Sequence, residues 1–140
     1  MILSVVIPTL DKRALLARTL AALRAQELSA GVAWEIVVVD DGCTDGTGDW
    51  LRQECDRSEK AGSGPSLRVV TPGGNVGRAR ARNLGVAEAR GSWVVFLDDD
   101  IVAPPGLLAA HLELLTRHPG DGTIGPAVTA PELVDAPHLH

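Results

Sequence analysis

Short runs of β-branched residues alternate along this chain with longer segments of helical period, and this alternation constrains the fold most. It is typical of an α/β domain with a mostly parallel sheet, because parallel strands are joined by crossovers that are usually helical. Strands are predicted at residues 2–7, 34–39, 67–71, 93–97 and 123–128. Helices are predicted at residues 12–26, from about 47, at 78–90 and from 105 onward. We therefore expect a single three-layer α/β/α, Rossmann-like domain over residues 1–140.

Local signals mark the ends of these elements. Asp11 is predicted to cap the first helix, in which Leu16, Leu20 and Leu23 recur on one face. Residues 56–66 (DRSEKAGSGPS) are polar and rich in Gly, Ser and Pro, so they are predicted to form a surface loop.

Composition excludes several classes of protein. A chain of 140 residues that is 45% apolar can bury one core, and a net charge of −5 disfavours binding to nucleic acid. No apolar run approaches the ~20 residues of a membrane span, and no basic leader precedes a cleavage site. A cytoplasmic location, or a peripheral membrane one for a longer chain, is therefore expected. Cys43 and Cys55 are expected to be reduced thiols.

Unusual polar residues follow three of the predicted strands, at residues 8–11, 40–46 and 98–100. If the crossovers are right-handed, as nearly all parallel ones are, these segments share the carboxyl edge of the sheet. Open α/β sheets bind ligands along that edge. We therefore expect the three segments to build one site.

Three adjacent aspartates, Asp98, Asp99 and Asp100, end the apolar stretch WVVFL. In an extended chain Asp98 and Asp100 point to one side while Asp99 points elsewhere. Mg²⁺ and Mn²⁺ prefer oxygen ligands, so the spacing suits a metal–diphosphate site. The alternative is a solvated acidic turn that caps the helix opening at Pro105.

Two other segments carry candidate ligand contacts. Asp40 and Asp41 end the second strand, where a carboxylate can accept a hydrogen bond from a nucleobase or a ribose; the alternative is an Asx-type turn. The segment GGNVGRARARNLG joins a glycine turn to a helix start with arginines, which favours an anionic ligand. Arg78, nearest the turn, is the preferred contact, against the alternative of a solvated or salt-bridged side chain.

Taken in order, the blocks VVIPTLDK, VVVDDGCTDGT, GGNVGRARARNLG and WVVFLDDDIVAPPGLL resemble the family-2 glycosyltransferases with the GT-A fold. The resemblance spans residues 2 to about 115 and implies the nucleotide-sugar-binding part of such a domain. It implies that Pro8 and Thr9 line the base pocket and that Asp41 contacts the base.

The same resemblance makes Asp98, Asp99 and Asp100 the DXD motif of the family. Asp98 would then contact the ribose or the metal, and Asp99 would belong to the donor site. Asp100 would ligate the Mn²⁺ or Mg²⁺ that bridges the diphosphate.

The resemblance also implies the activity: metal-dependent transfer of a sugar, with inversion, from a nucleoside-diphosphate sugar to an unknown acceptor. A UDP-sugar is the favoured donor. Inverting members take their general base from a later segment, which has no recognisable counterpart before His140. We therefore assign no catalytic base, expect the acceptor-binding part to be absent, and expect self-association or a C-terminal partner segment. The alternative is a non-catalytic or truncated nucleotide-sugar-binding module.

Overall fold

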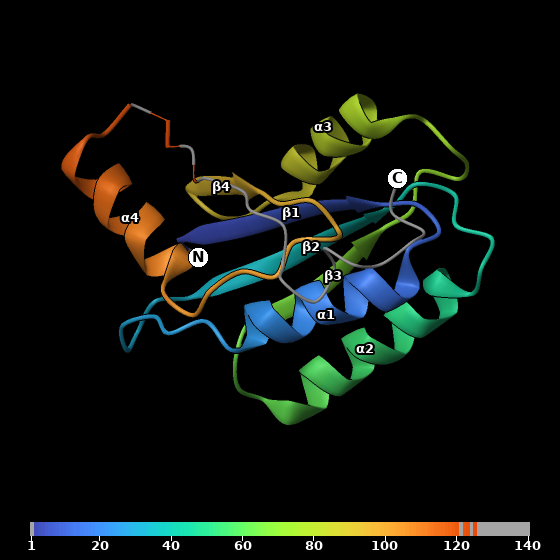
Figure 1. The fold of residues 1–140 in the computed structure, drawn as a ribbon, viewed down its shortest axis with the longest axis horizontal. Coiled ribbons are helices and arrows are strands. Elements are labelled where there is room, and N and C mark those ends of the chain that lie inside the picture. The colour runs from blue at the N-terminus through green and yellow to red at the C-terminus, as the bar shows by residue number, and fades with distance from the viewer. Residues whose placement is uncertain (1, 121, 124, 126–140) are drawn as a thin grey trace, which may run out of the picture.

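A computed structural model describes residues 2–120, 122, 123 and 125, which form four strands alternating with four helices (Figure 1). In chain order the elements are β1 (Leu3–Thr9), α1 (Arg13–Arg24), β2 (Trp34–Asp40), α2 (Thr47–Ala61), β3 (Ser66–Val70), α3 (Arg78–Glu88), β4 (Trp93–Phe96) and α4 (Leu107–Arg117). The strand predicted at 123–128 falls mostly outside the described residues. Among those residues, no helix is both long and apolar enough to cross a bilayer.

The strands form one parallel sheet in the order β3-β2-β1-β4. β1 and β2 lie side by side in its centre, with Val5 of β1 opposite Ile36 of β2 and Val95 of β4. Every residue of these two strands is buried. Continuous burial is expected of parallel strands that are covered on both faces, and it explains why their sequences are runs of Val and Ile.

Helices cover both faces of the sheet, as the sequence predicted. On one face Val5 and Ile36 belong to the core that also contains Leu16 and Leu20 of α1 and Leu51 of α2. On the opposite face α3 packs against β1 and β2. Figure 1 shows α1 and α2 on one side of the sheet and α3 on the other, which confirms the three-layer α/β/α architecture.

The predicted cap of α1 is wrong. Lys12 occupies the N-cap position, and its side chain makes no capping hydrogen bond to the helix. Asp11 instead has a left-handed backbone, with φ of 52°, and its Oδ1 accepts a hydrogen bond from the Thr44 N–H at 2.7 Å. The carboxylate therefore joins the loops that follow β1 and β2 rather than capping a helix.

The loop predicted at residues 56–66 is also largely wrong, because α2 continues to Ala61. Leu51 and Glu54 are buried on the inner side of α2, and the charged residues that follow lie on its exposed side. Gly62, in a left-handed conformation, ends the helix. The polar composition thus reflects a solvated helix face, and only residues 62–65 connect α2 to β3.

Both cysteines are free thiols and partly buried, which agrees with the reduced state expected from the sequence.

Candidate functional site

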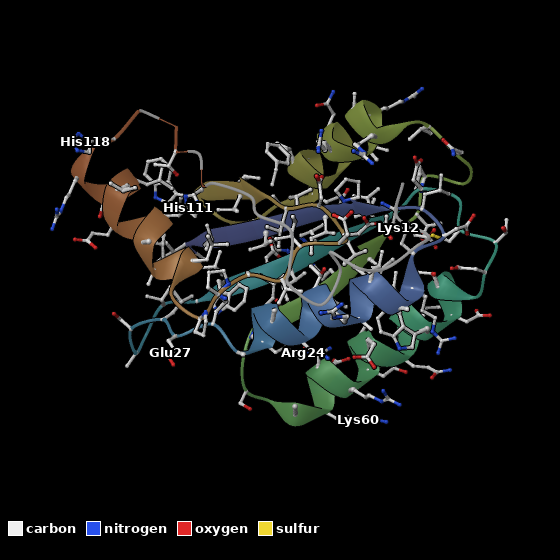
Figure 2. The ribbon with its side chains drawn as sticks, in the orientation of Figure 1. Lys12, Arg24, Glu27, Lys60, His111 and His118 are labelled. Atoms are coloured by element: carbon white, nitrogen blue, oxygen red, sulfur yellow. The ribbon has the colours of Figure 1, made fainter. Side chains whose placement is uncertain are left out.

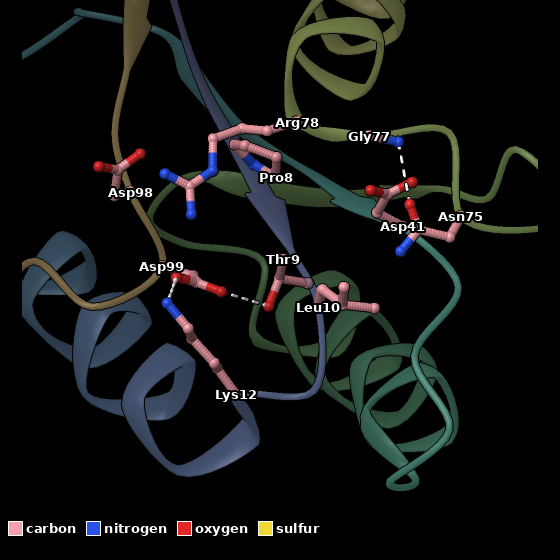
Figure 3. Close-up of a pocket in the computed structure, with 10 residues that line it drawn as sticks. All are labelled: Pro8, Thr9, Leu10, Lys12, Asp41, Asn75, Gly77, Arg78, Asp98 and Asp99. Carbon is pink, nitrogen blue, oxygen red and sulfur yellow. Dashed lines mark hydrogen bonds and ion pairs between the residues drawn. The ribbon is translucent and has the colours of Figure 1, made fainter. Parts of the chain in front are cut away.

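The carboxyl ends of the strands surround a pocket of about 340 Å³ (Figure 3). Its lining comes from the ends of β1, β2 and β4 and from the start of α3: Pro8, Thr9, Leu10, Lys12, Asp41, Asn75, Gly77, Arg78, Asp98 and Asp99. In the order β3-β2-β1-β4 the crossover direction reverses between β1 and β4, and open α/β sheets bind ligands at such a point. The pocket includes every residue predicted to bind a donor nucleotide, whereas Asp100 is outside its lining.

One wall of the pocket is built around Asp41, a buried residue. The Asp41 N–H donates to the Thr9 carbonyl oxygen at 3.0 Å, which continues the pairing of β1 with β2 beyond the strand ends. Its Oδ1 accepts a hydrogen bond from the Val76 N–H at 2.7 Å. One carboxylate oxygen of Asp41 thus fixes the neighbouring loop, and the other accepts no hydrogen bond from the part of the chain that the structure describes.

Asp40, in contrast, has a structural role in the loop, which was the alternative to ligand binding. Its Oδ1 accepts a hydrogen bond from the Cys43 N–H at 2.8 Å, which is an Asx-type turn. Gly42, inside this turn, has φ of +87°, and a Cβ there would lie 2.8 Å from the Asn75 nitrogen. Glycine is therefore required at this position by both backbone conformation and space.

Asp99 is the buried member of the aspartate run and anchors the end of β4. Its Oδ2 accepts a hydrogen bond from Thr9 Oγ1 at 2.9 Å, and its Oδ1 lies 3.4 Å from Lys12 Nζ (Figure 3). Its carbonyl oxygen accepts a third bond, from Thr19 Oγ1 of α1 at 3.0 Å. These contacts fix the carboxylate against β1 and α1.

Asp98 and Asp100 are much more exposed, with 43% and 44% of their side chains accessible. Oδ1 of Asp98 lies 2.9 Å from Arg82 Nη2, and Oδ2 of Asp100 lies 3.7 Å from Lys12 Nζ. The chain is not extended here, because Asp99 and Asp100 lie in a turn. The alternation that was expected to place Asp98 and Asp100 on one side therefore does not apply.

The aspartates nevertheless suit a hard divalent cation. Asp98 and Asp100 are accessible carboxylates, and each uses one oxygen for a cationic side chain. Oxygen donors of this kind are those that Mg²⁺ and Mn²⁺ prefer. The assignment of Asp98 and Asp100 as metal ligands stays a prediction.

A different grouping of potential metal ligands involves Asp11, Cys43 and Asp45. Burial raises the pKa of the Cys43 thiol to about 12, and the nearby Asp40 carboxylate adds to the shift. The thiol accepts a hydrogen bond from the Asp11 N–H at 3.3 Å. These residues also join the loops that follow β1 and β2, since the Thr44 N–H donates to Asp11 Oδ1.

Arg78 is exposed, and its side chain extends over the pocket from the start of α3 (Figure 3). Arg82, one helical turn further along, was not among the predicted site residues, although it holds Asp98. Its Nε is buried and has no hydrogen-bond partner among the described residues. The spacing of four from Arg78 was the signal that could have placed both side chains on one face of α3.

Lys12 lines the pocket but lies outside the segments predicted to build the site, whereas Leu10, Asn75 and Gly77 lie within them but were not named as contacts. Asn75 Oδ1 accepts a hydrogen bond from the Gly77 N–H at 3.0 Å, so it shapes the turn that leads into α3. For Lys12 the available signal was its position directly after a strand end that carries other candidate residues.

A model of the family described as glycosyl transferase family 2 matches residues 4–138. The chain belongs to this family. Among its relatives, it is 35% identical over 104 residues to an undecaprenyl-phosphate 4-deoxy-4-formamido-L-arabinose transferase of Pseudomonas aeruginosa, covering 74% of this chain. It is 40% identical over 117 residues to validoxylamine A glucosyltransferase of Streptomyces hygroscopicus, covering 79% of this chain. This family-2 chain spans 29% of the length of the first relative and 24% of the second.

Solved structures of GT-A glycosyltransferases share the fold of this family-2 chain. A mannosyltransferase from Pyrobaculum calidifontis, in complex with GDP-Man and Mn²⁺, matches with a TM-score of 0.73 and 28% identity over 93% of this chain and 36% of its own. Residues 1–349 of Staphylococcus aureus TarS, in complex with UDP-GlcNAc, match with a TM-score of 0.70 and 26% identity, covering 93% of this chain and 37% of theirs. The GT-A fold predicted from the sequence is thereby confirmed.

Proposed function

We propose that this family-2 chain binds a nucleoside-diphosphate sugar, with Mn²⁺ or Mg²⁺, as the donor site of a glycosyltransferase that inverts the anomeric centre. A UDP-sugar is the favoured donor, and the acceptor is unassigned. One observation carries the proposal: the segments after β1, β2 and β4 converge on one pocket at the point where the crossover direction reverses. Structural neighbours in complex with UDP-GlcNAc and with GDP-Man support it.

The nucleoside end of the donor is proposed to lie against Pro8, Thr9 and Asp41. Asp41 is buried and uses Oδ1 for the Val76 N–H, so Oδ2 can accept a hydrogen bond from a base. Asp99 contributes by holding the Thr9 hydroxyl at 2.9 Å. Because both carboxylates are fixed by protein contacts, this end of the pocket is formed before a ligand binds.

The diphosphate is proposed to lie between the start of α3 and the aspartates. The N–H groups of the first helical turn and the Arg78 guanidinium both attract an anion. Asp98 and Asp100 would hold the divalent cation that neutralises charge on the leaving diphosphate, a contribution of roughly several kcal/mol to the transfer step.

No general base is assigned among the described pocket residues, because Asp41, Asp98 and Asp99 each hold a neighbouring group. The activity for which this chain itself can be tested is therefore donor binding. Transfer to an acceptor is proposed for the whole protein. The relatives that this chain matches are several times longer than the chain itself.

Isothermal titration with UDP, GDP, dTDP and CDP, each with and without Mn²⁺, tests the proposal. We expect one nucleotide, UDP first, to bind in a manner that requires Mn²⁺, and Asp98→Asn or Asp100→Asn to weaken that binding by roughly 10- to 100-fold. Asp56→Asn makes the same charge change on the exposed side of α2 and should have no effect. Equal affinity for all four nucleotides, or binding that is independent of Mn²⁺, would contradict the proposal.

A further inference from the structure

Lys12 lies between the carboxylates of the aspartate run. Its Nζ is 3.4 Å from Asp99 Oδ1 and 3.7 Å from Asp100 Oδ2. Charge-assisted N–H···O bonds are usually near 2.7–2.9 Å, so the ammonium is shared loosely between the two carboxylates and held tightly by neither. Within the described residues, the Lys12 ammonium is the cationic group that contacts Asp100.

The backbone of Lys12 is fixed, whereas its charged end is not. Lys12 is the N-cap residue of α1, and its carbonyl oxygen accepts a bond from the Leu16 N–H at 2.9 Å. Its side chain is 37% exposed, and a lysine stem has several rotatable bonds. The ammonium can therefore move into solvent while the main chain stays in place.

The two carboxylates that contact Lys12 differ in how firmly the protein holds them. Asp99 is buried, and its second carboxylate oxygen, Oδ2, accepts a hydrogen bond from Thr9 Oγ1 at 2.9 Å. Asp100 is exposed, and its contact with Lys12 is long. Exposed ion pairs contribute little free energy, so replacing the contact between Lys12 and Asp100 by another cation costs the protein little stability.

We infer that Lys12 is an internal counter-ion of the aspartate run, which a divalent cation displaces when it binds Asp100. The inference rests on the proposed function, in which Asp100 is a metal ligand. Lys12 balances charge in the metal-free protein, and its repulsion lowers the affinity for metal when no nucleotide is present. It is thus a positioning residue that tunes metal binding.

The chain contains only two lysines, which provides a matched control. Lys60 lies at the far end of α2, away from Lys12 (Figure 2), and is exposed. Lys12→Met and Lys60→Met change the net charge equally, so a difference between them reports position and not overall charge. Lys12→Arg keeps the charge beside the carboxylates.

Calorimetric titration of these variants with Mn²⁺ alone is the first test. We expect Lys12→Met to lower the Kd for Mn²⁺ roughly three- to tenfold, because a cation of like sign at about 4 Å has been removed. Lys12→Arg and Lys60→Met should stay close to the wild type. A structural role for Lys12 would weaken metal binding or leave it unchanged, and either result would overturn the inference.

Competitive acylation of the two lysines gives an independent readout. Mn²⁺ should raise the labelling rate of Lys12 roughly two- to fivefold relative to that of Lys60, since the ammonium leaves its carboxylates. A constant ratio would mean that Lys12 is not displaced, while the proposed donor site would stand if the wild type binds Mn²⁺. If neither the wild type nor any variant binds Mn²⁺ with or without UDP, the proposed metal site fails and the inference fails with it.

Discussion

Three consecutive aspartates of this chain occupy three different environments. Asp98 pairs with Arg82 on α3, Asp99 is buried against Thr9, and Asp100 is exposed beside Lys12. The turn that begins at Asp99 separates the side chains in this way. Identical residues at adjacent positions should therefore respond differently to substitution.

Asp99→Ala should lower the free energy of unfolding by about 1–3 kcal/mol, because it leaves the buried Thr9 hydroxyl without its acceptor. Asp100→Ala, at an exposed position, should change it by no more than about 0.5 kcal/mol. Urea denaturation followed by circular dichroism measures both values. Equal losses for the two variants would refute the distinction between a buried anchor and an exposed side chain.

Much of the pocket could be predicted from the sequence, because strand ends are visible as the ends of apolar runs. That signal is sufficient to locate Pro8, Asp41 and Asp98 at one edge of the sheet. It does not give the contacts of Lys12, which depend on the left-handed turn at Asp11. The metal-ligand role of Asp98 and Asp100 stays a prediction.

At the scale of elements, helix ends proved harder to predict than strand ends. The four strands lie close to their predicted positions, whereas α2 runs through a segment whose polar composition suggested a loop. Composition alone does not separate a solvated helix face from a loop. The buried residues Leu51 and Glu54, three apart, carry the helical period that decides the question.

Helix α3 approaches the sheet most closely at Gly85. A Cβ at this position would lie 2.3 Å from Val6 Cγ1 and 3.1 Å from Val39 Cγ2. Gly85→Ala should therefore destabilise the protein by about 1–3 kcal/mol despite the better helix propensity of alanine, and a thermal melt would show it. Gly106→Ala is the control, because among the described residues other than its chain neighbours no atom would lie within 4 Å of the added Cβ. A stabilised Gly85→Ala variant would show that α3 does not pack as described.

Across the whole molecule, Glu35 links three strands on the α3 face of the sheet. Its fully buried carboxylate accepts hydrogen bonds from Ser4 on β1 at 2.6 Å, from Arg68 on β3 at 3.0 Å and from the Arg90 N–H at 2.7 Å. Burial on its own raises the pKa of Glu35, but the bonds from Arg68, Ser4 and Arg90 outweigh it and hold the pKa below its ordinary value of 4.5.

The stability contributed by this carboxylate is consequently present above pH 4.5 and lost as the pH falls below 4.5 through the folded-state pKa. Glu35→Gln should lower the free energy of unfolding at pH 7 by about 1.5–3 kcal/mol and reduce its acid dependence. Some dependence should remain, because the pKa of Glu54 is also lowered: Arg24 and Arg57 outweigh the effect of its burial.

Denaturation curves from pH 3 to 7 would measure the effect. Glu59→Gln, an equal charge change on the exposed side of α2, serves as the control. An acid limb with the same slope in Glu35→Gln and the wild type would show that this carboxylate is not what links folding to pH.

The tight contact between Gly42 and Asn75, with the bond from Val76 to Asp41, has a consequence for ligand affinity. Two loops far apart in the sequence are already in contact along one wall of the pocket. A ligand that binds there does not have to order them, so little conformational entropy is lost on association. Specificity at this wall is consequently a matter of rigid shape, and a ligand that does not fit is excluded instead of accommodated.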